Sequence, residues 1–261
     1  MTEDSLLLSF VGDRMLKCGS DYMLTSTLFL DVRQQSLVLS KTKVSDDVRA
    51  LFFGGFDTAE RNVLAFIPYY LEVSDFDSLK DYLTVNPEEN PLTVLRFKKD
   101  SFSTVSHRDY LGALMGLGIK REMIGDIVVT KDGADIIVMK SVAEYIKSEL
   151  KSVGRASVTV GEVTFDDISD MVTNVHEETI NVSSMRIDNI ISACFKLSRS
   201  ESADAVSSGN IYVNSLQILK CDKKINIGDK IVFRSKGKVV LKEVSGVSKK
   251  GRNFIKIDVY G

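Results

Sequence analysis

The chain has 261 residues, of which 44% are hydrophobic and 27% are charged, a composition that supports roughly two or three compact domains. It has no apolar run of about 20 residues, no basic signal-peptide start and three widely spaced cysteines. These features argue against a membrane span, a secretory leader and a disulfide framework. The charge is uneven: residues 1–90 carry a net −7, residues 91–183 a net −3 and residues 184–261 a net +8. A basic end on an acidic body indicates an anionic partner, either nucleic acid or a membrane surface.

The first part of the chain has the mixed pattern of an α+β domain, which we place at residues 1–88. A helix is expected over residues 5–19, with Gly19 as its end. Short strands are expected to follow over residues 37–39, 48–53 and 63–68. The polar stretch from Asn86 to Pro91 contains two of the three prolines and is typical of a linker.

The second part, residues 91–165, alternates strands and helices. Ser106 and Ser141 each precede an acidic residue by three positions, the spacing of a helix capping box, and we expect the two helices to end near Gly118 and Gly154. Asp132-Gly133 indicates a hairpin. Four strands are predicted, over residues 92–97, 126–130, 135–139 and 157–163. The resulting βαββαβ order predicts a ferredoxin-like, RRM-like domain. Its inner strand has no aromatic residue, so we do not expect base stacking on this sheet.

The third part follows an acidic stretch, residues 164–183, that we expect to be a linker with short irregular structure. Apolar residues at helical spacing predict a helix over residues 185–195. Ser198 and Glu201 form another capping box, and Gly209 ends the short helix that follows. Strands are predicted over residues 211–213, 230–234, 238–244 and 253–259.

Four motifs of the third part resemble an S4 RNA-binding domain in order and spacing. They are Arg186-Ile187-Asp188, Ser198-Arg199-Ser200-Glu201-Ser202-Ala203, Gly209-Asn210-Ile211-Tyr212-Val213-Asn214 and Ile227-Gly228-Asp229-Lys230-Ile231. The chain departs from the family pattern at Ile187, Ile211 and Ser215, where leucine, valine and glycine are usual. The resemblance implies a C-terminal S4 domain at residues 184–261, with a two-helix, αL-type start followed by β-strands and a terminal hairpin.

The resemblance extends over essentially the whole chain to the YlmH-type S4-domain proteins of bacteria. It is carried by residues 29–35, 54–61, 107–122 and 249–252. This family implies a cytoplasmic RNA-binding protein without an assigned enzymatic activity. It also implies association with the large ribosomal subunit and a role in handling stalled peptidyl-tRNA.

The expected RNA contacts in the third part combine a helix start with a cationic hairpin. Unpaired N–H groups and the positive helix end favour phosphate beside Arg199 and Ser200, and basic residues at the ends of the last hairpin suit a second phosphate contact. Asp188 is expected to position either backbone or Arg186, Ser198 also fits a helix cap, and Asn214 fits a turn residue equally well. The predicted residues are Arg186, Lys196, Ser198, Arg199, Ser200, Tyr212, Asn214, Lys236, Lys238, Lys249, Lys250 and Arg252.

A second predicted contact surface lies in the middle domain and consists of His107, Arg108, Lys120 and Arg121. For His107, a local role at the helix start is the alternative. Asp31, Asp57, Glu60 and Arg61 form either a polar site or the turn and cap chemistry around Gly54-Gly55.

The sequence has no phosphate-binding loop, nucleophile elbow or dinucleotide-binding fingerprint, and it has two histidines. We therefore expect a non-enzymatic protein without metal or cofactor. The expected partners are ribosomal or transfer RNA and the large ribosomal subunit, with no DNA and no membrane, and the protein is expected to be a monomer. One alternative is an RNA-modifying enzyme with its site in the N-terminal or middle domain. Another is a membrane-surface or division-associated scaffold, which the lack of a basic amphipathic helix disfavours.

Overall fold

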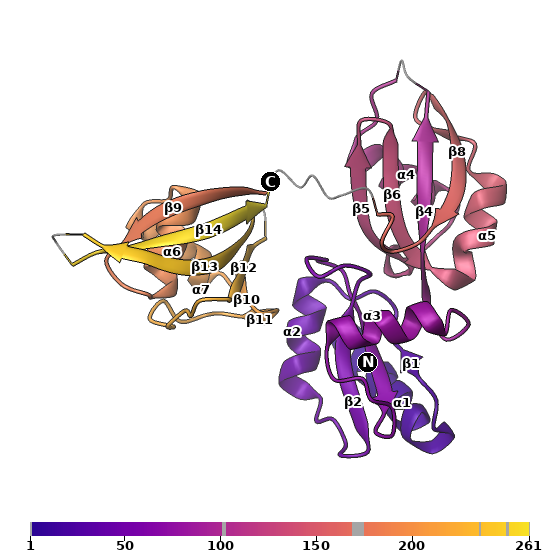
Figure 1. Cartoon of the computed structure of the whole chain (residues 1–261), viewed down its shortest axis with the longest axis horizontal. Coiled ribbons are helices and arrows are strands. Elements are labelled where there is room, and N and C mark those ends of the chain that lie inside the picture. The colour runs from indigo at the N-terminus through magenta and orange to yellow at the C-terminus, as the bar shows by residue number, and fades with distance from the viewer. Residues whose placement is uncertain (1, 101–102, 169–174, 235, 249–250, 261) are drawn as a thin grey trace. The chain divides into compact units, whose positions relative to one another are not determined.

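The computed structural model describes residues 2–100, 103–168, 175–234, 236–248 and 251–260. The chain has a mixed α+β fold and divides into two compact units (Figure 1). The first unit contains residues 1–34 and 41–171, and the second contains residues 172–261 together with residues 35–40. None of the described helices combines the length and the apolar character needed to cross a bilayer.

The first unit begins with helix α1 (Glu3–Asp21) and a three-stranded antiparallel sheet in the order β1-β3-β2. The strands are β1 (Thr25–Ser26), β2 (Val48–Phe53) and β3 (Val63–Pro68), and helix α3 (Phe76–Val85) follows. The predicted end of α1 at Gly19 is wrong, because the helix continues to a left-handed residue, Tyr22, with φ 54°. Gly19 instead permits a close approach, since a Cβ there would lie 2.9 Å from an Asp47 carboxylate oxygen.

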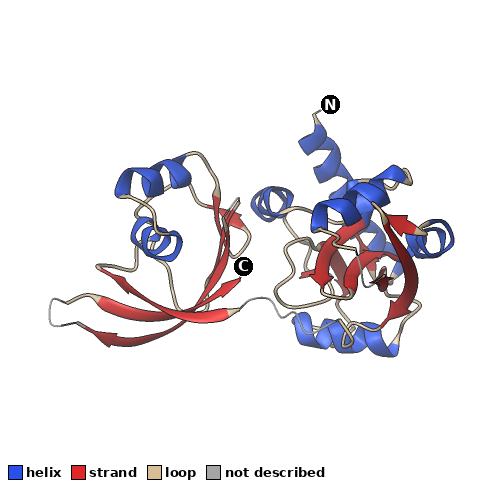
Figure 2. Ribbon diagram, turned by 90° about the horizontal axis from the view of Figure 1, so that it is seen from above, coloured by secondary structure: helices blue, strands red, loops and turns tan. Residues whose placement is uncertain are grey.

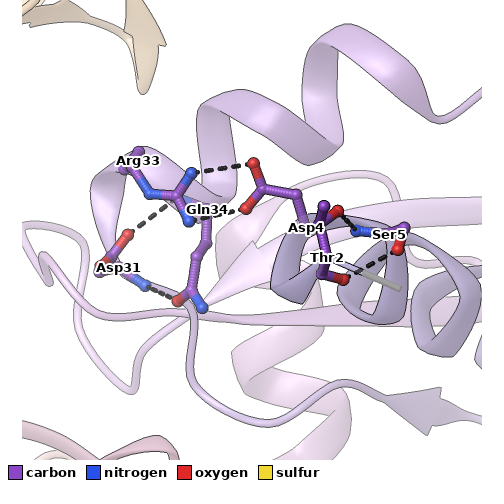
Figure 3. A network of polar contacts seen from close by, with 6 residues as sticks. All are labelled: Thr2, Asp4, Ser5, Asp31, Arg33 and Gln34. Carbon is purple, nitrogen blue, oxygen red and sulfur yellow. Dashed lines mark hydrogen bonds and ion pairs between the residues drawn. The ribbon is translucent and has the colours of Figure 1, made fainter.

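Helix α2 (Val32–Lys41) occupies the segment where the sequence predicted a strand at residues 37–39, so this prediction is wrong. The helix starts with a reciprocal cap that the prediction missed. The Asp31 carboxylate accepts from the backbone N–H of Gln34 at 2.8 Å, and the Gln34 side chain accepts from the N–H of Asp31 at 2.9 Å. Figure 3 shows this cap beside the ion pair between Arg33 and Asp4, which joins the starts of α2 and α1 at 2.8 Å.

The middle part confirms the predicted βαββαβ order. Its elements are β4 (Leu92–Lys99), α4 (His107–Gly116), the 3-10 turn η1 (Arg121–Met123), β5 (Ile124–Thr130), β6 (Gly133–Met139), α5 (Lys140–Glu149), β7 (Ser152–Val153) and β8 (Ala156–Val163). The antiparallel sheet has the order β5-β6-β4-β8-β7. Helix α5 starts one residue before Ser141 and ends before Gly154, which lies in the β7–β8 turn with φ 60°. The predicted cap and end of this helix are therefore wrong.

Both faces of this sheet are covered within the first unit. On one face, Leu95 and Ile136 pack with Tyr110 of α4 and Ile146 of α5. On the other face, the side chains of β4 and β6 share a core with the N-terminal part of the chain, and the buried residues include Phe29, Phe53, Val94, Ile137 and Met139. The face on which RRM domains stack bases is therefore buried here. The two predicted domains at 1–88 and 91–165 share this core.

The second unit packs two helices on one face of a six-stranded antiparallel sheet (Figure 2). It contains β9 (His176–Val182), α6 (Ile187–Phe195), α7 (Arg199–Ser207), β10 (Ile211–Val213), β11 (Leu216–Gln217), β12 (Lys230–Phe233), β13 (Gly237–Val247) and β14 (Asn253–Tyr260). The expectation of irregular structure before residue 183 is wrong for β9. This strand pairs with β14 and buries Ile180 and Val182.

Candidate RNA-binding surface

The start of helix α7 is fixed by a capping box. The Ser198 hydroxyl accepts from the backbone N–H of Glu201 at 3.2 Å, and the Glu201 carboxylate accepts from the N–H of Ser198 at 2.7 Å. A hydrogen bond from the Ser198 side chain and the bond from the Ser198 backbone N–H, both to the Glu201 carboxylate, hold the pKa of Glu201 below its usual value. Arg199 and Ser200 consequently lie exposed in the first turn, where the positive helix end attracts anions.

A cavity of about 300 Å³ lies beside this turn, between α6 and α7. Its lining consists of two arginines and polar side chains: Ser183, Arg186, Asp188, Asn189, Ser192, Arg199 and Ser202. The Asp188 carboxylate accepts two hydrogen bonds from the Arg186 guanidinium, at 3.1 and 2.6 Å, which raises the pKa of Arg186. Asp188 therefore positions Arg186, as predicted. Within the described residues no carboxylate pairs with Arg199, so the cavity keeps a net positive charge.

Four polar residues of this cavity were missed from the sequence: Ser183, Asn189, Ser192 and Ser202. The sequence contained a signal for Asn189 and Ser192, because they lie three positions apart in a helix whose isoleucines are buried. Polar residues opposite the buried positions mark the solvent-facing side of an amphipathic helix.

Other predicted residues of the second unit lie at turns and strand ends. Lys196 ends α6 with φ 53° and is exposed. Lys236 is exposed near the Phe233 ring, and Arg252 donates to the Asn181 carbonyl at 3.0 Å. Lys249 and Lys250 lie outside the described residues.

Asn214 serves as a turn residue. Its side chain donates to an Asp229 carboxylate oxygen at 2.8 Å and accepts from the Lys230 N–H at 2.9 Å. Asn214 and Ser215 both have positive φ, 48° and 66°, as a two-residue hairpin turn of type I′ requires. Of the two alternatives for Asn214, the structure supports the turn.

Tyr212 and Lys238 do not lie where an RNA contact requires. Their exposed fractions are 1% and 5%. Val232 pairs with Tyr212 on one neighbouring strand and with Lys238 on the other, so the three residues form a row across the sheet, on the face opposite the helices. The Lys238 ammonium lies 4.5 Å from the centre of the Tyr260 ring. Their burial leaves little surface for the predicted RNA contact, and it follows from tertiary packing that the motif does not specify.

Of the four residues predicted as a middle-domain RNA surface, three are exposed and one is engaged in internal hydrogen bonds. His107, Arg108 and Lys120 are exposed. The Arg121 guanidinium is half-buried and donates to the carbonyls of Ile124 at 2.6 Å and Gly125 at 3.3 Å. Burial and the neighbouring Arg61 lower the pKa of Arg121 to about 10. Partial burial of the His107 imidazole and the charge of Arg121 lower the pKa of His107.

The polar group around Arg61 is engaged in internal contacts. The Arg61 guanidinium donates to the carbonyls of Phe29, Arg121 and Ile124, and the backbone N–H groups of Glu60 and Arg61 donate to the Asp126 carboxylate. Gly54 allows the turn, since a Cβ there would lie 2.4 Å from the Ala59 Cβ. The arrangement joins the N-terminal part to β5. Across the described residues no group of three or more side chains could hold a metal ion.

Residues 90–167 match a family model described as "Putative RNA-binding domain in YlmH". The "Ribosome-associated protein quality control protein P2" of Bacillus subtilis is 30% identical over 234 residues, which cover 88% of this chain and 85% of the relative. A solved structure, "Cell division protein ylmH from Streptococcus pneumoniae", matches with 21% identity and a TM-score of 0.49, over 64% of this chain and 94% of that chain. The identity and the coverage of the Bacillus relative place this chain in the YlmH family of proteins.

Proposed function

We propose that this protein is a non-catalytic RNA-binding factor that binds structured ribosomal or transfer RNA on the large ribosomal subunit. Its role would be the handling of stalled peptidyl-tRNA in the cytoplasm, where it would act as a monomer. The description of the matching family model and the name of the Bacillus relative support this proposal. The concentration of positive charge in residues 184–261, a net +8, supports it independently.

The second unit would act as an S4 domain. Two short helices are followed by strands, and the motifs of the resemblance fall at the starts of α6 and α7, at β10 and at the turn before β12. The observation that carries the proposal is the position of Arg199. It lies in the first turn of α7 and shares a cavity with Arg186.

The chemistry of this cavity suits the phosphate of an RNA backbone. The helix end supplies N–H donors and a positive potential, and the planar guanidinium of Arg199 can donate two parallel bonds to phosphate oxygens. Contacts of this kind fix the position of a nucleic acid without reading its sequence. Recognition would therefore depend on the shape of the folded RNA.

The test is the substitution Arg199→Glu in the full-length protein, with filter binding to ribosomal RNA and transfer RNA. Reversing the charge at a phosphate contact should weaken both affinities by about tenfold or more. Lys17→Glu is the matched control, since Lys17 is an exposed cation of α1 that lies outside residues 90–167. Unchanged binding of Arg199→Glu, or an equal loss in both variants, would remove this cavity from the proposal.

A further inference from the structure

The N-terminal part of the first unit presents a patch of large, exposed side chains. It consists of Tyr22, Met23, Tyr69 and Tyr70, with exposed fractions of 61, 51, 57 and 53%, and we call it the tyrosine patch. The Tyr70 hydroxyl donates to the Tyr22 carbonyl at 2.6 Å, and the rings of Tyr69 and Tyr70 meet edge to face with centroids 6.2 Å apart. These contacts join the end of α1 to the end of β3 in one continuous surface.

The patch is held in place before any partner arrives. Tyr22 has a positive φ of 54°, which is uncommon for a residue other than glycine, and the bond from Tyr70 secures it. The backbone N–H of Tyr69 donates to the Asp47 carbonyl at 3.1 Å. Rigid tyrosines lose little conformational entropy on binding, and they are enriched at protein interfaces.

The surroundings of the patch are acidic. Asp21 precedes Tyr22 and is exposed, and Asp47 adjoins Tyr69. The nearby Arg49 guanidinium already donates to the carbonyls of Leu71 and Val73. Residues 1–90 contain 15 acidic and 8 basic residues, so this surface repels phosphate and attracts cations.

We propose that the tyrosine patch binds a lysine- or arginine-rich segment of another protein. Ring faces of tyrosine attract ammonium and guanidinium groups, and the carboxylates at the rim would pair with the same cations. The aliphatic stems of lysine and arginine can pack on the apolar parts of the rings and on Met23. RNA lacks the cations that this surface would recognise.

The experiment uses the full-length protein and a fluorescent short peptide of alternating lysine, arginine and glycine, with binding followed by anisotropy. The variant is Tyr22→Asn/Tyr69→Thr, since asparagine tolerates the left-handed conformation and Tyr70 keeps its bond to residue 22. The loss of two cation–ring contacts should weaken binding about tenfold. Tyr145→Thr is the matched control, because Tyr145 is 49% exposed on α5. A glutamate-rich peptide of the same length should not bind.

Several results would overturn the proposal. Equal affinities of the double variant and the parent protein would do so, as would an equal loss in Tyr145→Thr. If the double variant lost affinity for RNA and not for the peptide, the patch would be an RNA surface. If light scattering showed self-association that the double variant abolished, the occupant would be a second copy of this chain. A circular dichroism melt like that of the parent would show that the variant is folded.

Discussion

Tyr110 carries a buried hydroxyl with no hydrogen-bond partner among the described residues. Its ring is fully buried and meets Phe97 edge to face at 5.8 Å. Because an unpaired buried hydroxyl costs about 1–3 kcal/mol, Tyr110→Phe should raise the free energy of unfolding by about 1 kcal/mol, measured by urea denaturation. Tyr145→Phe, on the exposed face of α5, should change it little. A fall in the urea midpoint for Tyr110→Phe would mean that the hydroxyl has a partner.

Residue-scale prediction from the sequence succeeded where the chemistry is local. The capping box at Ser198 and the exposed position of Arg199 follow from neighbouring residues alone. Tyr212 and Lys238 are buried, and their exposure depends on strands that lie far apart in the chain. A motif identifies the residue type at a position and leaves its burial undetermined.

The prediction from the sequence missed helix α2 and strand β9 for different reasons. The cap of α2 by Asp31 and Gln34 was visible as an acidic residue with a glutamine three positions later. Strand β9 is defined by its pairing with β14, about 75 residues away, and its polar sequence gave a weak pattern. Signals within one element can be read from the chain, whereas pairing across this distance cannot.

The Arg61 guanidinium donates to carbonyls of three elements: the N-terminal part, η1 and β5. Arg61→Met keeps an unbranched apolar stem and removes every donor. Three carbonyls would each lose a hydrogen bond from a charged donor, although the Ile124 carbonyl would still accept from Arg121. We therefore expect the free energy of unfolding to fall by about 2–4 kcal/mol in urea denaturation. Arg155→Met should leave it nearly unchanged. RNA affinity should also stay unchanged in Arg61→Met, and a selective loss of RNA affinity with full stability would instead indicate a binding role for Arg61.

For the whole molecule, the uneven charge could be read from the sequence, whereas the core shared by the first two predicted domains was not anticipated. Strand β6 is buried along its entire length, and its run from Ile136 to Met139 is continuously apolar. Such a run is typical of a strand covered on both faces. The sequence therefore indicated that both faces of β6 are covered, but it did not identify the segment that covers the second face.

The net charge of −2 conceals a basic second unit. If that unit neutralises about five phosphates, log K against log salt should fall with a slope of about −3.5 to −4.5, measured by filter binding with the full-length protein. Arg199→Gln should make this slope shallower by about 0.7–0.9, the contribution of one phosphate. Arg108→Gln tests the middle-domain surface in the same way, because it changes the slope only if that surface also contacts RNA. A parent slope near zero would contradict phosphate neutralisation, since hydrogen bonds and stacking alone release few counterions.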